Sequence, residues 1–138
     1  MIRRFLQQWF NIPPWKNAEY IKDDRGEKFW VSWNDLQEDV AKIRLRYRSY
    51  QAGHVNINEE NDTLLTLADI HVANSYRGRG LGKQMINRII QWAKQSGYQE
   101  ISGVIKPSEE VTLEYLQEWY KRQGFKVEDR KLSFDLTG

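Results

Sequence analysis

A glycine-rich segment, RGRGLG at residues 77–82, lies between an apolar run at 64–72 and a helix-like run that begins near Leu81. The first N–H groups of a helix have no partner within the helix, so a helix that follows such a loop offers them to an anion. Glycines let a phosphate group approach the backbone without meeting Cβ atoms. Arg79 and Lys83 add positive charge. We therefore expect a phosphorylated ligand to bind at this loop.

The charged residues around the loop are all basic. The net charge of the chain is only +2, which is too small to indicate a nucleic-acid-binding protein. Residues 70–99, however, contain no acidic side chain. The basic residues of this segment are Arg77, Arg79, Lys83, Arg88 and Lys94. Such a segment attracts phosphorylated ligands, although a solvated basic helix would show the same composition.

Two common phosphate-binding motifs do not fit the loop. The P-loop of nucleoside triphosphatases, G-x-x-x-x-G-K-[ST], requires Ser or Thr after its Lys, whereas Gln84 follows Lys83. The dinucleotide motif G-x-G-x-x-G fails because the glycines here are spaced G-x-G-x-G. No acidic residue lies about twenty positions later at the end of a second strand, where it would bind a ribose hydroxyl. The loop therefore belongs to another class of phosphate site.

Hydrophobic periodicity predicts the elements that position the loop. Residues 64–72 are almost continuously apolar, which favours a central strand covered on both faces. A helix is predicted from about Leu81 to Gln95, followed by a strand at 100–105 that runs parallel to the first. A second helix is expected from Ser108, as its N-cap, to about Gln123.

The other predicted elements are shorter. Residues 41–50 alternate apolar and basic side chains, which indicates a half-buried strand, and a solvated basic face is favoured over an anion-binding one. Gly53 is expected to allow a turn or bulge after this strand. Further elements are predicted at 2–10 (helix), 29–33 (strand), and 125–129 and 131–136 (two closing strands).

Length and composition favour one soluble domain over residues 1–138, with an abbreviated N-terminal region. The absence of Cys excludes disulfides, thiolate metal sites and a Cys nucleophile, and two widely separated His residues do not suggest a metal site. No run approaches about 20 apolar residues. We therefore expect no metal, no membrane segment and a cytoplasmic location.

The loop resembles the cofactor motif of a known family. Arg77, Gly80 and Gly82 form R-x-x-G-x-G, and Ile70 and Val72 form the I-x-V before it. This pattern is similar to the acetyl-coenzyme A motif of the GNAT superfamily of N-acetyltransferases. The later strings EISGVI and LEYLQEWYKRQGF resemble the next strand and helix of that family.

The resemblance covers about residues 41–136. It implies an α+β, three-layer fold, in which a mixed and mostly antiparallel central sheet contains a parallel, splayed strand pair and has flanking helices. It also implies that the pyrophosphate of acetyl-CoA lies on the amides from Gly78 to Lys83, and that the pantetheine arm pairs with Ile70 and Val72. The cofactor-binding residues that it implies are Ile70, Val72, Arg77, Gly78, Arg79, Gly80, Leu81, Gly82 and Lys83.

The implied reaction is transfer of the acetyl group to a primary amine, whose identity the sequence does not give. An alkyl ammonium with a pKa of about 10.4 is almost fully protonated at pH 7, and only the neutral amine attacks a thioester. The site must therefore help to remove a proton. Tyr120, four residues before Gly124, matches the general-acid Tyr of the family motif Y-x-x-x-G-F.

The proton acceptor remains open at this stage. Ala68 and Thr66 occupy the positions where relatives often carry Glu or His. Asp69 and His71 lie beside them, but strict alternation turns both to the opposite face unless a bulge intervenes, so a water relay is a further candidate. Leu113 also stands where the family often has Asn, which removes one expected side-chain contact to the cofactor.

Two other classes of function fit parts of this sequence. The missing base and short N-terminal region would suit a catalytically silent coenzyme A-binding or protein-interaction module. An anion or nucleic-acid binder would instead use Arg44, Arg46 and Arg48 with the loop arginines. The favoured partners are acetyl-CoA and an amine acceptor, and neither nucleic acid nor a membrane is expected. We expect the chain to be a monomer or a homodimer.

Overall fold

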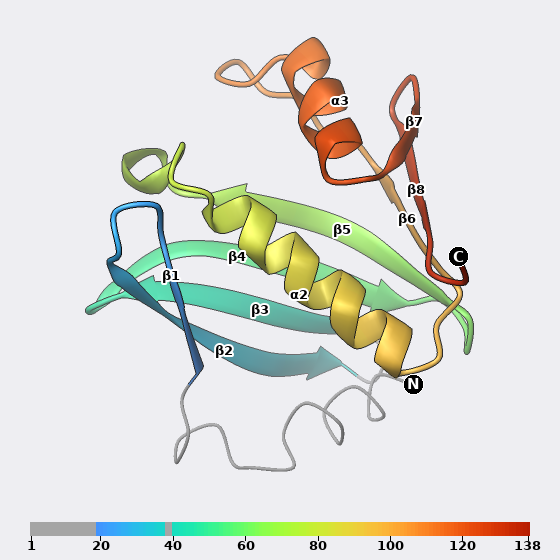
Figure 1. The fold of residues 1–138 in the computed structure, drawn as a ribbon, viewed down its shortest axis with the longest axis horizontal. Coiled ribbons are helices and arrows are strands. Elements are labelled where there is room, and N and C mark those ends of the chain that lie inside the picture. The colour runs from blue at the N-terminus through green and yellow to red at the C-terminus, as the bar shows by residue number, and fades with distance from the viewer. Residues whose placement is uncertain (1–18, 38–39) are drawn as a thin grey trace.

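The computed structural model describes residues 19–37 and 40–138. An eight-stranded sheet runs through them in the order β1-β2-β3-β4-β5-β6-β8-β7 (Figure 1). Its strands are β1 (Glu19–Lys22), β2 (Lys28–Gln37), β3 (Val40–Tyr47), β4 (Tyr50–Glu59), β5 (Leu64–Val72), β6 (Glu100–Val104), β7 (Lys126–Glu128) and β8 (Lys131–Asp135). The helical segments are the 3-10 turn η1 (Asn74–Tyr76) and the helices α2 (Leu81–Gln95) and α3 (Leu113–Arg122).

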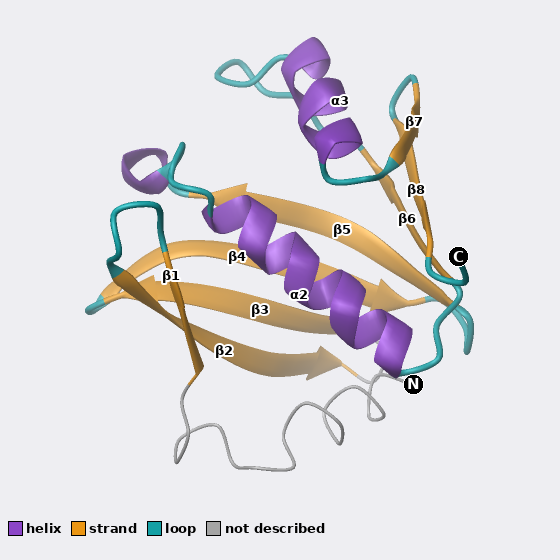
Figure 2. Cartoon of the chain, in the orientation of Figure 1, coloured by secondary structure: helices purple, strands orange, loops and turns teal. Residues whose placement is uncertain are grey.

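The described sheet is antiparallel except between β5 and β6, which run parallel. Helix α2 crosses one face of the first five strands, and α3 lies beside the leaf formed by β6, β8 and β7 (Figure 1). Loops and η1 connect the end of β5 to the start of α2 (Figure 2). The expected mixed sheet with flanking helices and one parallel strand pair is confirmed.

Alternation along the strands determines which face α2 covers. Every second side chain of the central strands is buried beneath the helix, whose own apolar stripe recurs every three or four residues. The buried strand residues include Ile43, Leu45, Val55, Ile57, Leu65 and Leu67, and those of the helix include Leu81, Met85, Ile86 and Ile89. This contact fixes the N-terminus of α2 at the end of β5, because the helix axis is held by its buried stripe.

A β-bulge in β5 separates it from β6. Asn56 of β4 lies opposite Asp69, whereas the next residue of β4, Ile57, lies opposite Leu67, so Ala68 is the extra residue. β5 pairs with β6 only over Leu64–Leu67, which is the part before the bulge. Beyond it the two parallel strands separate, and this confirms the expected splayed pair.

The prediction that both faces of β5 are covered was wrong. Ile70 and Val72 lie on the same face as Leu67, because the bulge at Ala68 shifts the alternation by one residue. The apolar run therefore belongs to one face interrupted by a bulge, and it does not mark a strand with two buried faces. On the opposite face, His71 is exposed.

The bulge predicted at Gly53 is present, whereas the hairpin turn lies earlier in the chain. β3 ends at Tyr47 and β4 begins at Tyr50, so the hairpin turn includes Arg48, whose φ is 55°. Gly53 lies within β4 next to a register shift, and is therefore part of a bulged region. A Cβ at Gly53 would lie 2.6 Å from the carbonyl oxygen of His71, so the close approach of β4 and β5 requires glycine here.

Helix α3 begins four residues later than predicted for a Ser108 N-cap. The hydroxyl of Ser108 accepts hydrogen bonds from the amides of Glu110 and Val111, and so stabilises a separate turn. Thr112 is the N-cap, because its Oγ1 accepts a hydrogen bond from the amide of Tyr115. Ser is preferred over Thr as an N-cap, so capping propensity alone did not indicate Thr112.

The remaining predictions have different outcomes. The strands predicted at 29–33, 125–129 and 131–136 correspond to parts of β2, β7 and β8. The helix predicted at residues 2–10 lies outside the described residues. Within the described part of the chain, no helix is long and apolar enough to cross a membrane.

We expect Gly53→Ala to lower the free energy of unfolding by about 1–3 kcal/mol, because its methyl group would push β4 away from the His71 carbonyl. Urea denaturation of both proteins measures this difference. Gly138→Ala is the control, since a Cβ there meets no atom closer than 4.0 Å. Equal stabilities of Gly53→Ala and the wild type would contradict the close approach.

Candidate functional site

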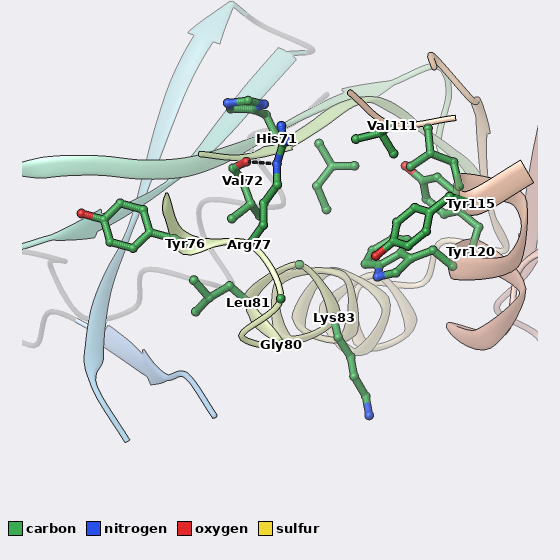
Figure 3. A pocket seen from close by; sticks show the side chains of 15 residues that line it. His71, Val72, Tyr76, Arg77, Gly80, Leu81, Lys83, Val111, Tyr115 and Tyr120 are labelled. Carbon is green, nitrogen blue, oxygen red and sulfur yellow. Dashed lines mark hydrogen bonds between the residues drawn. The ribbon is translucent and has the colours of Figure 1, made fainter. Parts of the chain in front are cut away.

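A cavity of about 230 Å³ lies where the end of β5, the start of α2 and the inner side of α3 meet (Figure 3). Its lining includes Ile70, His71 and Val72 from β5 and residues from Tyr76 to Lys83, except Arg79, from the loop and first turn of α2. Val111 and four residues of α3 complete it, namely Tyr115, Leu116, Trp119 and Tyr120. The structure thus gathers at one cavity all of the predicted cofactor-binding residues except Arg79.

The loop presents a run of free backbone donors to this cavity. Among the described residues, the amides from Gly78 to Lys83 donate no backbone hydrogen bond, and the first such bond of the helix comes from Gln84. Gly80 is the N-cap, has a φ of 79°, and has no side chain that could cap the helix. Uncapped first-turn amides and the helix dipole together favour an anion at this position.

Arg77 braces the rim of the cavity. Its Nε donates to the carbonyl oxygen of Val72 at 2.9 Å (Figure 3), and its Nη1 donates to a carboxylate oxygen of Glu110 at 2.9 Å. Glu110 lies in the connection between β6 and α3, so this ion pair links the two sides of the cavity. In this structure Arg77 therefore stabilises the end of β5 through its hydrogen bond to the Val72 carbonyl.

The side chain of Arg79 points into the scaffold, away from the cavity. Its guanidinium pairs with Asp23 at 3.4 Å, donates to the carbonyl of Ser75 and lies over the ring of Tyr76. The Arg79 carbonyl accepts a hydrogen bond from the amide of Asp24. The turn between β1 and β2 thereby holds the loop on the side away from the cavity. The spacing of the motif did not indicate this role of Arg79.

Lys83 differs from the two arginines, because its side chain is exposed and makes no ion pair with a described residue. In Figure 3 it extends from the first turn of α2 away from Tyr115 and Tyr120. Its ammonium is therefore available to an anion at the mouth of the cavity. The Leu81 side chain is buried in the core, so this residue can offer a ligand only its backbone.

Tyr120 lies at the inner end of the cavity. Its ring is 6% exposed and packs edge-on against Trp119 and Phe125, at centroid distances of 5.0 and 5.5 Å. Burial, together with the nearby Asp69 carboxylate, raises the pKa of Tyr120 above that of a free phenol. The hydroxyl receives no hydrogen bond from a described residue, so it remains a protonated donor that a ligand can use.

A smaller cavity of about 50 Å³ adjoins the first one. Three residues line both cavities, namely Ile70, Leu116 and Tyr120, so the Tyr120 side chain borders both. Asp69 and Lys106 line only the smaller one. Its volume suits a few water molecules or the head of a primary amine.

The charged groups of the smaller cavity are held by hydrogen bonds. Oδ2 of Asp69 lies 3.1 Å from Nε2 of His54, the residue of β4 that stands diagonally across the ladder. Nζ of Lys106 donates to the carbonyl oxygen of Ala68 at 3.0 Å. Asp69 therefore lies near Tyr120 on the splayed strand, while His71 lines only the larger cavity.

Sequence reasoning missed the contribution of α3 apart from Tyr120. Leu116 stands one helical turn before Tyr120, so helical spacing could have identified it. Trp119 lines the cavity because α3 packs against the start of α2, where a Cβ on Gly82 would lie 3.1 Å from its ring. That contact depends on how two helices pack, and no local sequence signal indicates it.

The model of the GNAT acetyltransferase domain matches residues 25–127, a range that extends from before β2 into β7 and includes both cavities. This chain belongs to the GNAT acetyltransferase family. An uncharacterised N-acetyltransferase from Methanocaldococcus jannaschii is 23% identical over 131 residues, which cover 91% of this chain. The chain spans only 56% of the length of that relative.

Solved GNAT structures share the fold at low sequence identity. The GNAT domain of S. lividans PAT superposes with a TM-score of 0.69 at 10% identity, covering 86% of this chain and 96% of that domain. A GNAT acetyltransferase from Elizabethkingia anophelis, solved with acetyl-CoA bound, gives a TM-score of 0.61 at 15% identity, covering 70% of this chain and 76% of that one. These likenesses establish the GNAT fold of the chain.

The Asp23–Arg79 pair that supports the GNAT loop predicts a pH-dependent stability. Burial alone would raise the pKa of Asp23, but hydrogen bonds from the amides of Glu27 and Arg25, together with Arg79, lower it below the ordinary value of 3.8. A lowered pKa in the folded state means that the unfolded chain binds the proton more tightly. The stabilisation is therefore complete above the ordinary value and is lost as the pH falls through the folded-state pKa.

We expect Asp23→Asn to lower the midpoint of thermal unfolding by several degrees at pH 7, because Arg79 loses its buried partner. At a pH well below 3.8 the difference should be smaller, since the wild-type carboxyl becomes protonated as the pH falls through its folded-state pKa. Asp24→Asn, which changes an exposed neighbour, is the control. A difference that is equally large at both pH values would contradict this role of the ion pair.

Proposed function

We propose that this chain is an acetyl-CoA-dependent N-acetyltransferase that acetylates a primary amine. The observation that carries the proposal is the run of free amides from Gly78 to Lys83 at one end of a cavity whose other end is the Tyr120 hydroxyl. One end suits a pyrophosphate and the other suits a reacting thioester. The acetyl-CoA present in the Elizabethkingia anophelis relative supports the same choice of ligand.

The separation of β5 and β6 leaves a free strand edge for the part of the ligand that lies between these two ends. Beyond Leu67, β5 has no strand partner on its β6 side. Its backbone groups there are therefore available for hydrogen bonds, except the Ala68 and Val72 carbonyls, which accept from Lys106 and Arg77. A pantetheine arm carries amide groups and can use this edge at Ile70 and Val72 as an additional strand would. The Arg77 bond to the Val72 carbonyl holds the edge in place.

We infer that Asp69 is the group that receives the amine proton. Its side chain is 43% exposed, lies in the smaller cavity beside Tyr120 and is oriented by His54. A carboxylate stabilises an incoming ammonium and passes a proton to water when the amine becomes the nucleophile. His71 lies on the larger cavity and is placed less well for an amine that enters from the smaller one.

Tyr120 then acts on the leaving group. Because its pKa is raised, complete transfer of its proton to a thiolate with a pKa of about 8.5 is strongly uphill. The hydroxyl therefore stabilises the departing thiolate by donating a hydrogen bond, and solvent supplies the proton afterwards. This role requires the phenolic hydroxyl but not its ionisation.

We expect calorimetric titration with acetyl-CoA to show one site per chain with micromolar affinity. Lys83→Glu should weaken binding on the order of ten-fold or more, because the new carboxylate would face the pyrophosphate. Lys131→Glu is the control, since it makes the same change in charge on an exposed residue that lies outside the cavity. Absence of binding to the folded wild type would refute the transferase function.

We expect Tyr120→Phe to lower the rate of acetyl transfer roughly ten-fold or more, with little change in the affinity for acetyl-CoA. Tyr115→Phe is the matched control, because Tyr115 lies on the same helix and lines the same cavity but is 58% exposed. Release of coenzyme A with a set of amine acceptors measures the rate. An unchanged rate in Tyr120→Phe would remove this residue from the mechanism, and binding without turnover for any amine would favour a catalytically silent module.

A further inference from the structure

Lys106 places an amine of the chain itself beside the reacting groups. It follows β6, reaches across the splay and donates from Nζ to the carbonyl oxygen of Ala68 at 3.0 Å. Ala68 is the bulged residue at which β5 leaves β6, so its carbonyl has no β6 partner. Lys106 is exposed and lines the smaller cavity, which Asp69 and Tyr120 also line.

The contact stabilises the separation of β5 and β6. Its position also places the Lys106 amine near the expected acyl group. Tyr120 borders both cavities, so an acyl group that reaches Tyr120 in the larger cavity lies next to the space that Lys106 lines. Other lysines of the described chain line neither this cavity nor the Tyr120 end of the larger one, because Lys83 lies at the opposite end on α2.

We propose that Lys106 is a site of self-acetylation, at which the chain transfers an acetyl group from its bound thioester to its own ε-amine. The proposal rests on the proposed function, because it requires acetyl-CoA in the larger cavity. It differs from that function in naming an acceptor within the protein. The substrate class of the site is therefore a lysine ε-amine held near the Ala68 carbonyl.

The transfer balances without any further reactant. The Lys106 ammonium loses one proton, through Asp69 to water, and its neutral nitrogen attacks the thioester carbonyl carbon. A C–N bond forms, the C–S bond breaks and the second proton is lost from nitrogen. The thiolate leaves with a hydrogen bond from Tyr120 and is protonated by solvent. The products are ε-N-acetyl-Lys106, free coenzyme A and one proton.

The modified side chain would change the cavity that it occupies. Acetylation removes the positive charge beside Asp69, while the amide N–H that remains can still donate to the Ala68 carbonyl. The added acetyl group also fills much of a space of about 50 Å³. A modified chain would therefore have less room for a second amine.

The test is tandem mass spectrometry of the full chain after incubation with acetyl-CoA, with the extent of acetylation quantified at each lysine. We expect Lys106 to be acetylated at least about ten times faster than the exposed controls Lys94 and Lys131, because it is held next to the reacting groups. Tyr120→Phe should slow acetylation at Lys106 and leave the rate at both controls unchanged. The rate per chain should not depend on protein concentration, as expected for transfer within one molecule.

Lys106→Arg keeps the charge and a donor for the Ala68 carbonyl, so this variant should fold and bind acetyl-CoA but gain no acetyl group at position 106. Binding of acetyl-CoA with no excess of acetylation at Lys106 over the controls would overturn the self-acetylation while leaving the proposed function intact. A rate that rises with protein concentration would equally overturn transfer within one chain. Absence of acetyl-CoA binding would instead refute the proposed function and, with it, this inference.

Discussion

The short pairing between β5 and β6 is the constraint on which the rest of the site depends. Parallel strands normally continue side by side, but here the bulge at Ala68 ends the ladder after Leu67. The free edge of β5 beyond this point lines both cavities, and Tyr120 of α3 borders both. A regular strand at 68 would close the sheet and leave no space for a ligand between its strands.

Several contacts stabilise β5 where it is separated from β6. Arg77 occupies the Val72 carbonyl, Lys106 occupies the Ala68 carbonyl, and Gly53 lets β4 approach the His71 carbonyl closely. Arg77 and Lys106 thereby supply hydrogen-bond donors to carbonyls of β5 that lie beyond its pairing with β6. The residues that shape the cavity are thus mainly those that stabilise the interrupted strand.

Much of the fold followed from local patterns. The bounds of α2, the parallel relation of β5 and β6 and the position of the loop depend on periodicity and chain connectivity, which a single sequence contains. The bulge at Ala68 could not be read in the same way, because the face that each residue occupies depends on its partner on β4. Without that register, LLTLADIHV looked like a strand buried on both sides.

In the site, too, some features follow from local sequence and others depend on contacts between distant residues. The glycine spacing located the amides that have no backbone partner. It did not indicate the role of Arg79, because its partner Asp23 lies 56 residues earlier in the chain. Similarly, Asp69 could be chosen over His71 only once the two cavities were known. Motif residues thus indicated the type of ligand, and long-range packing determined which side chains reach it.

The most direct test of the anion cradle is an NMR titration in which ¹⁵N-labelled protein receives acetyl-CoA. The proposed binding mode predicts that the amide signals from Gly78 to Lys83 shift together, with one dissociation constant, and that their exchange with solvent slows, because these free donors gain phosphate acceptors. Saturable binding that leaves these signals unchanged would place the ligand elsewhere and contradict the assignment of this loop.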